Sequence, residues 1–256
     1  MGVSYTTRMC SKMELASKLL SKLFPSRCIL CSKTVNAPVI NEAVELCGTC
    51  YQKQPFNTTF CIRCALPLLD DNAGDTLCGR CIQKLPEYDY AHSVFRYEGD
   101  IIRLVHQLKF SEKITYARSI GECLLSAYDS DAGLKKEKPD CLLPVPLHAS
   151  RLRQRGFNQS IEIARVLSVK RDISIECGAV IRERSTTSQT GLNAKQRQKN
   201  IKSAFKVVSE MQYKNVLIID DVVTTGSTVN ELAKLLKKNS IERVGVLSIA
   251  RAPVKN

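Results

Sequence analysis

Residues 216–228 of this 256-residue chain read VLIIDDVVTTGST. The four apolar residues 216–219 are typical of a strand that is covered on both faces in a parallel sheet, and they predict a central strand. Apolar residues then recur at helical spacing over residues 227–238, which predicts a helix directly after the strand. A strand that turns into a helix in this way indicates an α/β protein.

The junction between this strand and this helix combines two acids with a small, hydroxyl-rich turn. Gly226 supplies the backbone freedom that the turn needs. The amides of residues 225–228 converge at a helix N-terminus, where unpaired N–H groups and the positive end of the helix dipole favour a phosphate. Asp220 and Asp221 repel a phosphate, but they accept hydrogen bonds from ribose hydroxyls or hold a divalent cation through water. The junction therefore predicts a ligand with a ribose and a 5′-phosphate.

Other interpretations of the junction are weaker. The plainest alternative is a polar turn and a capped helix with solvated acids. Such a turn needs neither two acids nor a row of small hydroxyl and glycine residues. The chain contains no GxxxxGK and no GxGxxG. A Walker A loop and a dinucleotide-binding fingerprint are therefore excluded.

Eight of the twelve cysteines form four CxxC pairs in the first third of the chain. Their spacing approximates that of zinc ribbons, in which two hairpin knuckles each give two thiolates to a tetrahedral Zn²⁺. A disulfide framework is the alternative, but a cytosolic setting keeps thiols reduced, and four pairs exceed what one redox site requires. Two structural Cys₄ zinc sites are expected, and an interleaved pairing is the alternative grouping. In the simplest grouping the first site is Cys28, Cys31, Cys47 and Cys50, and the second is Cys61, Cys64, Cys78 and Cys81.

The chain is strongly basic, with 38 Lys and Arg against 25 Asp and Glu and a formal charge of +13. Two zinc–thiolate centres of about −2 each lower the total to about +9. Residues 151–206 hold thirteen basic side chains against four acidic ones, so the anion-attracting surface is expected in this part of the chain. No apolar run approaches the roughly 18 residues that span a membrane, and a signal peptide is not evident. A folded cytoplasmic protein without membrane insertion is expected.

The chain is expected to have two modules. Apolar residues over 15–23 predict an amphipathic N-terminal helix, which together with the cysteine pairs forms a first module at residues 1–88. Residues 89–256 form the α/β domain. Its further elements are expected as strands at 93–97, 141–145, 204–208 and 243–249 and helices at 100–110 and 159–167.

Two basic segments are expected to line the ligand pocket. Residues 144–160, PVPLHASRLRQRGFNQS, place Arg151, Arg153 and Arg155 within five residues after a strand end. Guanidinium groups form bidentate bonds with phosphate oxygens, so this density suits a pyrophosphate; a solvated basic loop is the alternative. The polar and basic segment 182–200 is long for a connection, which is typical of lids and binding loops.

Residues 216–228 resemble the phosphoribosyl pyrophosphate signature of the type I phosphoribosyltransferases. The resemblance implies that Asp220 and Asp221 bind the ribose diol and that Mg²⁺ accompanies the pyrophosphate. The residues that it implies for the 5′-phosphate are Thr224, Thr225, Gly226, Ser227 and Thr228.

Nearly the whole chain resembles the ComF family, competence-associated proteins that join a double zinc ribbon to a phosphoribosyltransferase domain. The shared features are the CxxC pairs, LKF at 108–110, PVPLH and RxRGFNQ within 144–159, QTGL with an arginine and an asparagine within 189–200, and the acidic signature. The resemblance implies an α/β fold with a parallel sheet of the type I phosphoribosyltransferase kind, flanked by helices and preceded by a small cysteine-rich double zinc ribbon. It also implies a catalytic set of Asp220, Asp221 and Arg197.

Members of this family are associated with natural transformation, where they act in the cytoplasm on incoming single-stranded DNA. The resemblance therefore implies binding of phosphoribosyl pyrophosphate with Mg²⁺, single-stranded DNA as a partner, and phosphoribosyl transfer to a nitrogen nucleophile if the site is active. The alternatives are a metabolic phosphoribosyltransferase of nucleotide or sugar metabolism, and a non-catalytic scaffold that docks another competence or DNA-processing protein.

Overall fold

The computed structural model describes most of the chain, namely residues 26–35, 45–68, 76–110, 114–184, 201 and 203–253, with the backbone alone at residues 110, 114 and 115. The chain divides into two compact units, Met1–Lys53 and Gln54–Asn256. The module boundary near residue 88 stays a prediction. The helix expected at 15–23 lies outside the described residues.

The second unit contains a five-stranded parallel sheet with the strand order β1-β7-β6-β2-β3. Its middle strand is β6, and residues 216–219 within β6 are 0% exposed, which confirms the predicted central strand. β6 continues to Val223, so both acids of the junction lie in the strand itself. The strands are β1 (Tyr90–Arg96), β7 (Arg243–Arg251), β6 (Asn215–Val223), β2 (Cys141–Pro144) and β3 (Ser174–Ile175).

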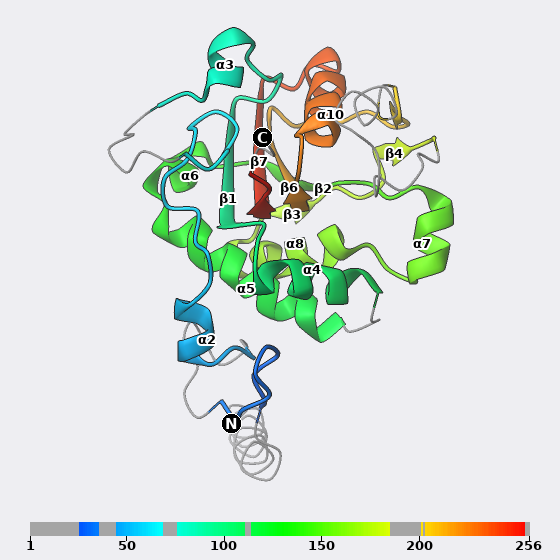
Figure 1. Ribbon diagram of the computed structural model, residues 1–256. Coiled ribbons are helices and arrows are strands. Elements are labelled where there is room, and N and C mark those ends of the chain that lie inside the picture. The colour runs from blue at the N-terminus through cyan, green and yellow to red at the C-terminus, as the bar shows by residue number, and fades with distance from the viewer. Residues whose placement is uncertain are drawn as a thin grey trace, which may run out of the picture. The chain divides into compact units, whose positions relative to one another are not determined.

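Helices connect the parallel strands and cover the sheet (Figure 1). Such crossover connections are right-handed in nearly all proteins. The connections from β1 to β2 and from β2 to β3 run across the sheet in one direction, and the connection from β6 to β7 runs in the other. The first connection contains α4 (Asp100–Phe110), α5 (Ile114–Ser130) and α6 (Ala132–Glu137), the second contains α7 (Ala149–Arg155) and α8 (Gln159–Arg171), and the connection from β6 to β7 is α10 (Ser227–Lys238). Of the helices in the first two connections, α5 and α8 pack on the strands and cover one face, and α10 covers the other.

The direction of the crossovers reverses between the neighbouring strands β6 and β2. In open α/β sheets, ligands bind outside the carboxyl ends of the strands at such a switch point. The crevice between the carboxyl ends of β6 and β2 is therefore the place where the topology favours a ligand.

A separate antiparallel sheet pairs β4 (Val180–Arg182) with β5 (Phe205–Val207). The strand expected at 204–208 thus exists, but it does not join the main sheet. Its burial alternates, with Phe205 buried and its neighbour Lys206 exposed, which fits a ribbon covered on one side. None of the helices in the described part of the chain combines the length and apolar character that a membrane crossing needs.

Candidate functional site

The eight CxxC cysteines gather into two groups, Cys28, Cys31, Cys47 and Cys50, and Cys61, Cys64, Cys78 and Cys81, each with its sulfur atoms within 4.8 Å of one another. The Sγ atoms lie 3.7 Å apart in the pair Cys31 and Cys47 and 3.6 Å apart in the pair Cys64 and Cys78. A tetrahedral Zn²⁺ with Zn–S bonds of about 2.3 Å requires sulfur atoms about 3.8 Å apart, whereas a disulfide requires about 2.05 Å. The expected grouping is confirmed, and the two groups fit two zinc sites.

Each cysteine group combines a hairpin knuckle with a helix N-terminus. The first two cysteines of a group lie on the knuckle, which in the second group is closed by the Ala65 amide donating to the Cys61 carbonyl at 2.8 Å. The helices α2 (Gly48–Gln52) and α3 (Gly79–Gln83) begin directly after the third cysteine. Two hairpin knuckles were expected in each site. This expectation is wrong for the third and fourth cysteines of each group, which lie at the start of a helix. A helix N-terminus suits these cysteines because its positive end favours the thiolate.

The two acids of the junction are buried at the carboxyl end of β6, with Asp220 9% and Asp221 4% exposed. The Asp221 amide donates to Oδ1 of Asp220 at 2.9 Å. Oδ2 of Asp221 lies 3.0 Å from the ammonium of Lys109 and accepts a hydrogen bond from Nε2 of Gln159 at 3.1 Å. The alternative with solvated acids is therefore wrong, because α4 and α8 supply partners that hold the acid pair in place.

Burial controls the charge of Asp220. Burial raises the pKa of this carboxyl and the charge of the neighbouring Asp221 raises it further, while Lys109, the Asp221 amide and Arg182 lower it. Together these effects bring the pKa to about 7. A lone carboxylate in water titrates near 4. Asp220 therefore changes between its neutral and its charged form close to neutral pH. The charge of the acid pair thus depends on the charges of the groups beside it.

The turn after β6 has the backbone of an anion-binding loop. Gly226 has φ +81° and is the N-cap of α10, where it offers no side chain to the first amides of the helix. A residue with a Cβ is strained in this left-handed conformation. The hydroxyls of Thr225 and Ser227 lie 2.8 Å apart. Amides and hydroxyls are thus concentrated at the positive end of α10, next to the acids.

The three arginines expected at the pocket lie on α7, and the helix separates them. Arg151 and Arg155 are one helical turn apart and share a face, and both are half-buried, whereas Arg153 lies on another face and is exposed. Arg155 donates to Oε1 of Gln159 at 3.1 Å. Burial lowers the pKa of Arg155, and the charge of Asp221 opposes this. The helix therefore brings two of the three arginines toward the acids.

Three residues near the acids were not named as site residues from the sequence, although Gln159 and Arg182 belong to the two segments that were expected to line the pocket. Lys109 and Gln159 contact Asp221 directly. Arg182 is 7% exposed and its guanidinium lies 5.7 Å from the ring centre of Phe205. Burial lowers the pKa of Arg182, the charge of Arg151 lowers it further and Asp220 opposes the shift. Together these effects bring the pKa to about 10. The fourth predicted site arginine, Arg197, lies outside the described residues.

The chain matches two families of known domains. The Double zinc ribbon domain matches residues 19–87, and the Phosphoribosyl transferase domain matches residues 137–256. The first match covers both cysteine groups. The second covers the strands β2 and β6 and the loop at Gly226.

Curated relatives resemble the chain over most of its length. "DNA utilization protein YhgH" of Escherichia coli (strain K12) is 34% identical over 228 residues, which are 89% of this chain and 97% of that protein. "Competence protein F" of Haemophilus influenzae is 32% identical over 237 residues, 91% of this chain and 100% of that protein. "Competence protein ComFC" of Streptococcus pneumoniae is 29% identical over 118 residues, 46% of this chain and 51% of that protein. This chain belongs to the ComF family, in which a double zinc ribbon precedes a phosphoribosyltransferase domain.

Proposed function

We propose that this protein binds phosphoribosyl pyrophosphate with Mg²⁺ in the crevice at the carboxyl ends of β6 and β2. One observation carries the proposal: β6 ends in two buried acids and continues directly into the Gly226 loop at the N-terminus of α10. The acids accept hydrogen bonds from adjacent hydroxyls, and the loop donates to a phosphate. A ribose 5′-phosphate needs both kinds of group within the length of one sugar.

Each part of the ligand has its own protein groups. Asp220 and Asp221 accept hydrogen bonds from the ribose diol, and residues 224–228 hold the 5′-phosphate. Arg151 and Arg155 bind the pyrophosphate, since guanidinium groups form paired bonds with phosphate oxygens. Mg²⁺ neutralises charge on the pyrophosphate and, as is usual for this ion, is held largely by phosphate oxygens and water.

Phosphoribosyl transfer is the second candidate function, and the burial of the acids favours it. In this reaction the bond from C1 of the ribose to the pyrophosphate oxygen breaks with its electron pair, and a nitrogen nucleophile bonds to C1 and loses a proton. Asp220 and Asp221 fix the ring while Arg151 and Arg155 stabilise the leaving group, and Arg197 completes the catalytic set. A site closed to water protects the activated sugar from hydrolysis.

We place this site in a protein that serves natural transformation and acts in the cytoplasm on incoming single-stranded DNA. Support comes from relatives whose names refer to competence and DNA utilization and from exposed basic side chains on 151–206, namely Arg153, Arg165, Lys170, Arg171, Arg184 and Lys206. The aromatic residues of 151–206 are Phe157, which is half-buried, and Phe205, which is 7% exposed, so base stacking would be weak. Contact with DNA would therefore rest on phosphate charges.

Titration calorimetry with Mg²⁺ and phosphoribosyl pyrophosphate tests the site. The double variant Asp220→Ala/Asp221→Ala is expected to bind at least about 100-fold more weakly, since each hydrogen bond to a charged group contributes about 1.5–3 kcal/mol. Asp100→Ala is the control, because Asp100 is a 52% exposed acid that pairs with Arg103 on α4. Equal affinity of the native protein and the double variant contradicts the assignment.

A second titration, with single-stranded DNA at increasing salt, tests the role in transformation. Affinity is expected to fall steeply with salt, because each phosphate contact releases counterions. Arg153→Gln is expected to reduce the salt dependence of DNA affinity by the contribution of about one phosphate contact, while phosphoribosyl pyrophosphate binding stays unchanged. A DNA affinity that does not respond to salt excludes binding through the basic surface.

A further inference from the structure

The buried arginine at the end of β7 joins the second cysteine group to the loop after β6. Arg251 is 3% exposed. Its Nε donates to the carbonyl of Cys64 at 3.0 Å, and its Nη1 donates to the carbonyls of Val223 at 3.0 Å and of Thr224. A single buried side chain therefore connects the backbone of Cys64, in the second cysteine group, to the backbone of Val223 and Thr224 at the start of the loop.

Two residues that follow the second cysteine group reach the same loop and helix. The hydroxyl of Tyr88 lies beside Gly226, only 3.6 Å from where a Cβ on that glycine would stand, and Tyr88 is 3% exposed. The amide of Glu87 donates to Oδ1 of Asn230 in α10 at 2.8 Å. Tyr88 thus packs against the loop, and Glu87 bonds to the first turns of the helix that follows it.

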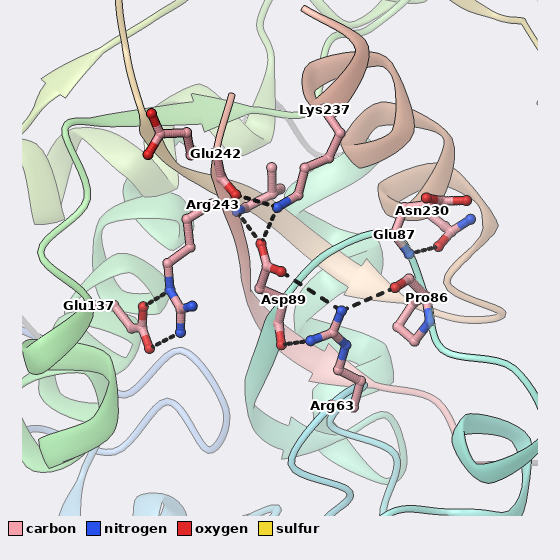
Figure 2. A network of polar contacts seen from close by, with 10 residues as sticks. Arg63, Pro86, Glu87, Asp89, Glu137, Asn230, Lys237, Glu242 and Arg243 are labelled. Carbon is pink, nitrogen blue, oxygen red and sulfur yellow. Dashed lines mark hydrogen bonds and ion pairs between the residues drawn. The ribbon is translucent and has the colours of Figure 1, made fainter. Parts of the chain in front are cut away.

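A polar network attaches the knuckle of the second cysteine group to the other end of α10 (Figure 2). Arg63, between Cys61 and Cys64, donates to the carbonyl of Asp89 at 2.5 Å and lies 3.8 Å from its carboxylate. That carboxylate accepts hydrogen bonds from the ammonium of Lys237 at 2.6 Å and from an amide of β7 at 2.8 Å. The knuckle is therefore attached to the last turn of α10 through Asp89 and Lys237. It is attached to the loop that precedes α10 through Arg251.

We propose that the second zinc site positions the loop at residues 223–228 for the 5′-phosphate, with Arg251 as the positioning residue. This inference rests on the proposed function. Four thiolates around Zn²⁺ carry a net charge of about −2, which a buried guanidinium offsets. Without the metal the knuckle loses the constraint that holds the Cys64 carbonyl, and Arg251 then releases the backbone of the loop.

The test compares Arg251→Met with Arg243→Met, an arginine at the start of the same strand that pairs with Glu137 on the surface. Hydrogen exchange of amides 223–230, zinc content and titration with ribose 5-phosphate are measured on the full chain. Arg251→Met is expected to speed exchange at 223–230 and to weaken ribose 5-phosphate binding about tenfold, the effect of one lost charged hydrogen bond. Arg243→Met is expected to change neither.

Where Arg251→Met does not fold, Arg63→Gln takes its place, since Arg63 is 24% exposed and its loss loosens the same attachment from the knuckle side. Faster exchange at 223–230 supports the inference. Unchanged exchange and affinity in a folded variant overturn it. A native protein that does not bind ribose 5-phosphate or phosphoribosyl pyrophosphate refutes the proposed function, and faster exchange in the variants would then still show that the attachment through Arg251 and the knuckle holds the loop.

Discussion

The two cysteine groups share one ligand pattern but differ in their surroundings. In the first group Cys31 is exposed and two further cysteines are only half-buried, whereas all four cysteines of the second group are buried. The second group belongs to the same buried cluster as the apolar residues of β6 and α10. The first group lies in the compact unit Met1–Lys53 and the second in Gln54–Asn256. A repeated sequence pattern thus forms a small separate unit once and part of a domain core once.

Because of this difference, we expect the loss of zinc from the two groups to affect different parts of the protein. Removing zinc from the first group affects a unit that folds around that ion. Removing zinc from the second group affects the core that carries the acids and the Gly226 loop.

Replacing one cysteine in each group is expected to separate the two sites. Cys81→Ser is expected to unfold the second unit at 25 °C, because a structural zinc contributes on the order of 10 kcal/mol and the stability of a whole domain is about 5–15 kcal/mol. Cys50→Ser is expected to leave the main unfolding transition in place. Scanning calorimetry with zinc analysis measures both. Equal loss of the main transition in the two variants contradicts the contrast.

Chelation is expected to remove the two zinc ions at different rates. The first group has an exposed cysteine, which a chelator reaches directly, whereas the second group opens only when the core opens. Zinc release followed with a colorimetric chelator should show a fast phase and a slow phase. Circular dichroism should change in the slow phase. A single phase for both ions would show that the sites are equally accessible.

Stability of the second unit is expected to depend on pH through Asp220. The pKa of this carboxyl is about 7 in the folded protein and near 4 in the unfolded chain, so the folded state binds more protons between these values. The free energy of unfolding should therefore fall as pH rises from 4 to 7, by an amount on the order of a few kcal/mol. Urea titrations measure it.

The control for the pH prediction is Asp220→Asn, which cannot ionise and should flatten the dependence between pH 5 and 7. Asp131 contributes outside that window, because its bond with His92 lowers its pKa to about 2 and its stabilisation is lost only as the solution becomes more acidic than about pH 4. An unchanged slope in Asp220→Asn shows that another group titrates.

The smallest effect is expected from Gly226→Ala. The φ of +81° at this position costs an alanine about 1–2 kcal/mol, which should lower the stability of the second unit by that amount. A matched variant at an exposed glycine without this strain, Gly79→Ala, has open space around the new Cβ and tests α3 in the same unit. Chemical denaturation of both variants gives the comparison, and equal costs would show that strain at Gly226 is not the cause.

Local patterns in the sequence predicted the parts of the fold that depend on local chemistry. The apolar run at 216–219 and the helical stripe at 227–238 were confirmed as parts of β6 and α10. A strand that is buried on both faces is apolar throughout, whereas a helix that is buried on one face is apolar at helical spacing, so the two patterns can be told apart in a sequence. The grouping of the cysteines was also confirmed, since the two pairs of each group are neighbours along the chain.

Features that depend on packing between distant segments were missed. The helix α5, seventeen residues long, was not predicted, because Gly121 in its middle weakens the helical signal. A Cβ at Gly121 would stand 2.7 Å from Val166 of α8, so the glycine serves close helix packing. Lys109 and Gln159 lie 112 and 62 positions from Asp221, and no spacing in the sequence links them to it. The separation of Arg153 from Arg151 and Arg155 required knowing that this segment is a helix.

The most direct test of the ligand site follows the amide resonances of residues 224–229 by NMR while Mg²⁺ and phosphoribosyl pyrophosphate are added. We predict saturable shifts of the Gly226, Ser227 and Thr228 amides in the native protein and their loss in Asp220→Asn/Asp221→Asn. Resonances that stay in place at millimolar ligand, in a protein that holds two zinc ions and is fully folded, would contradict the account.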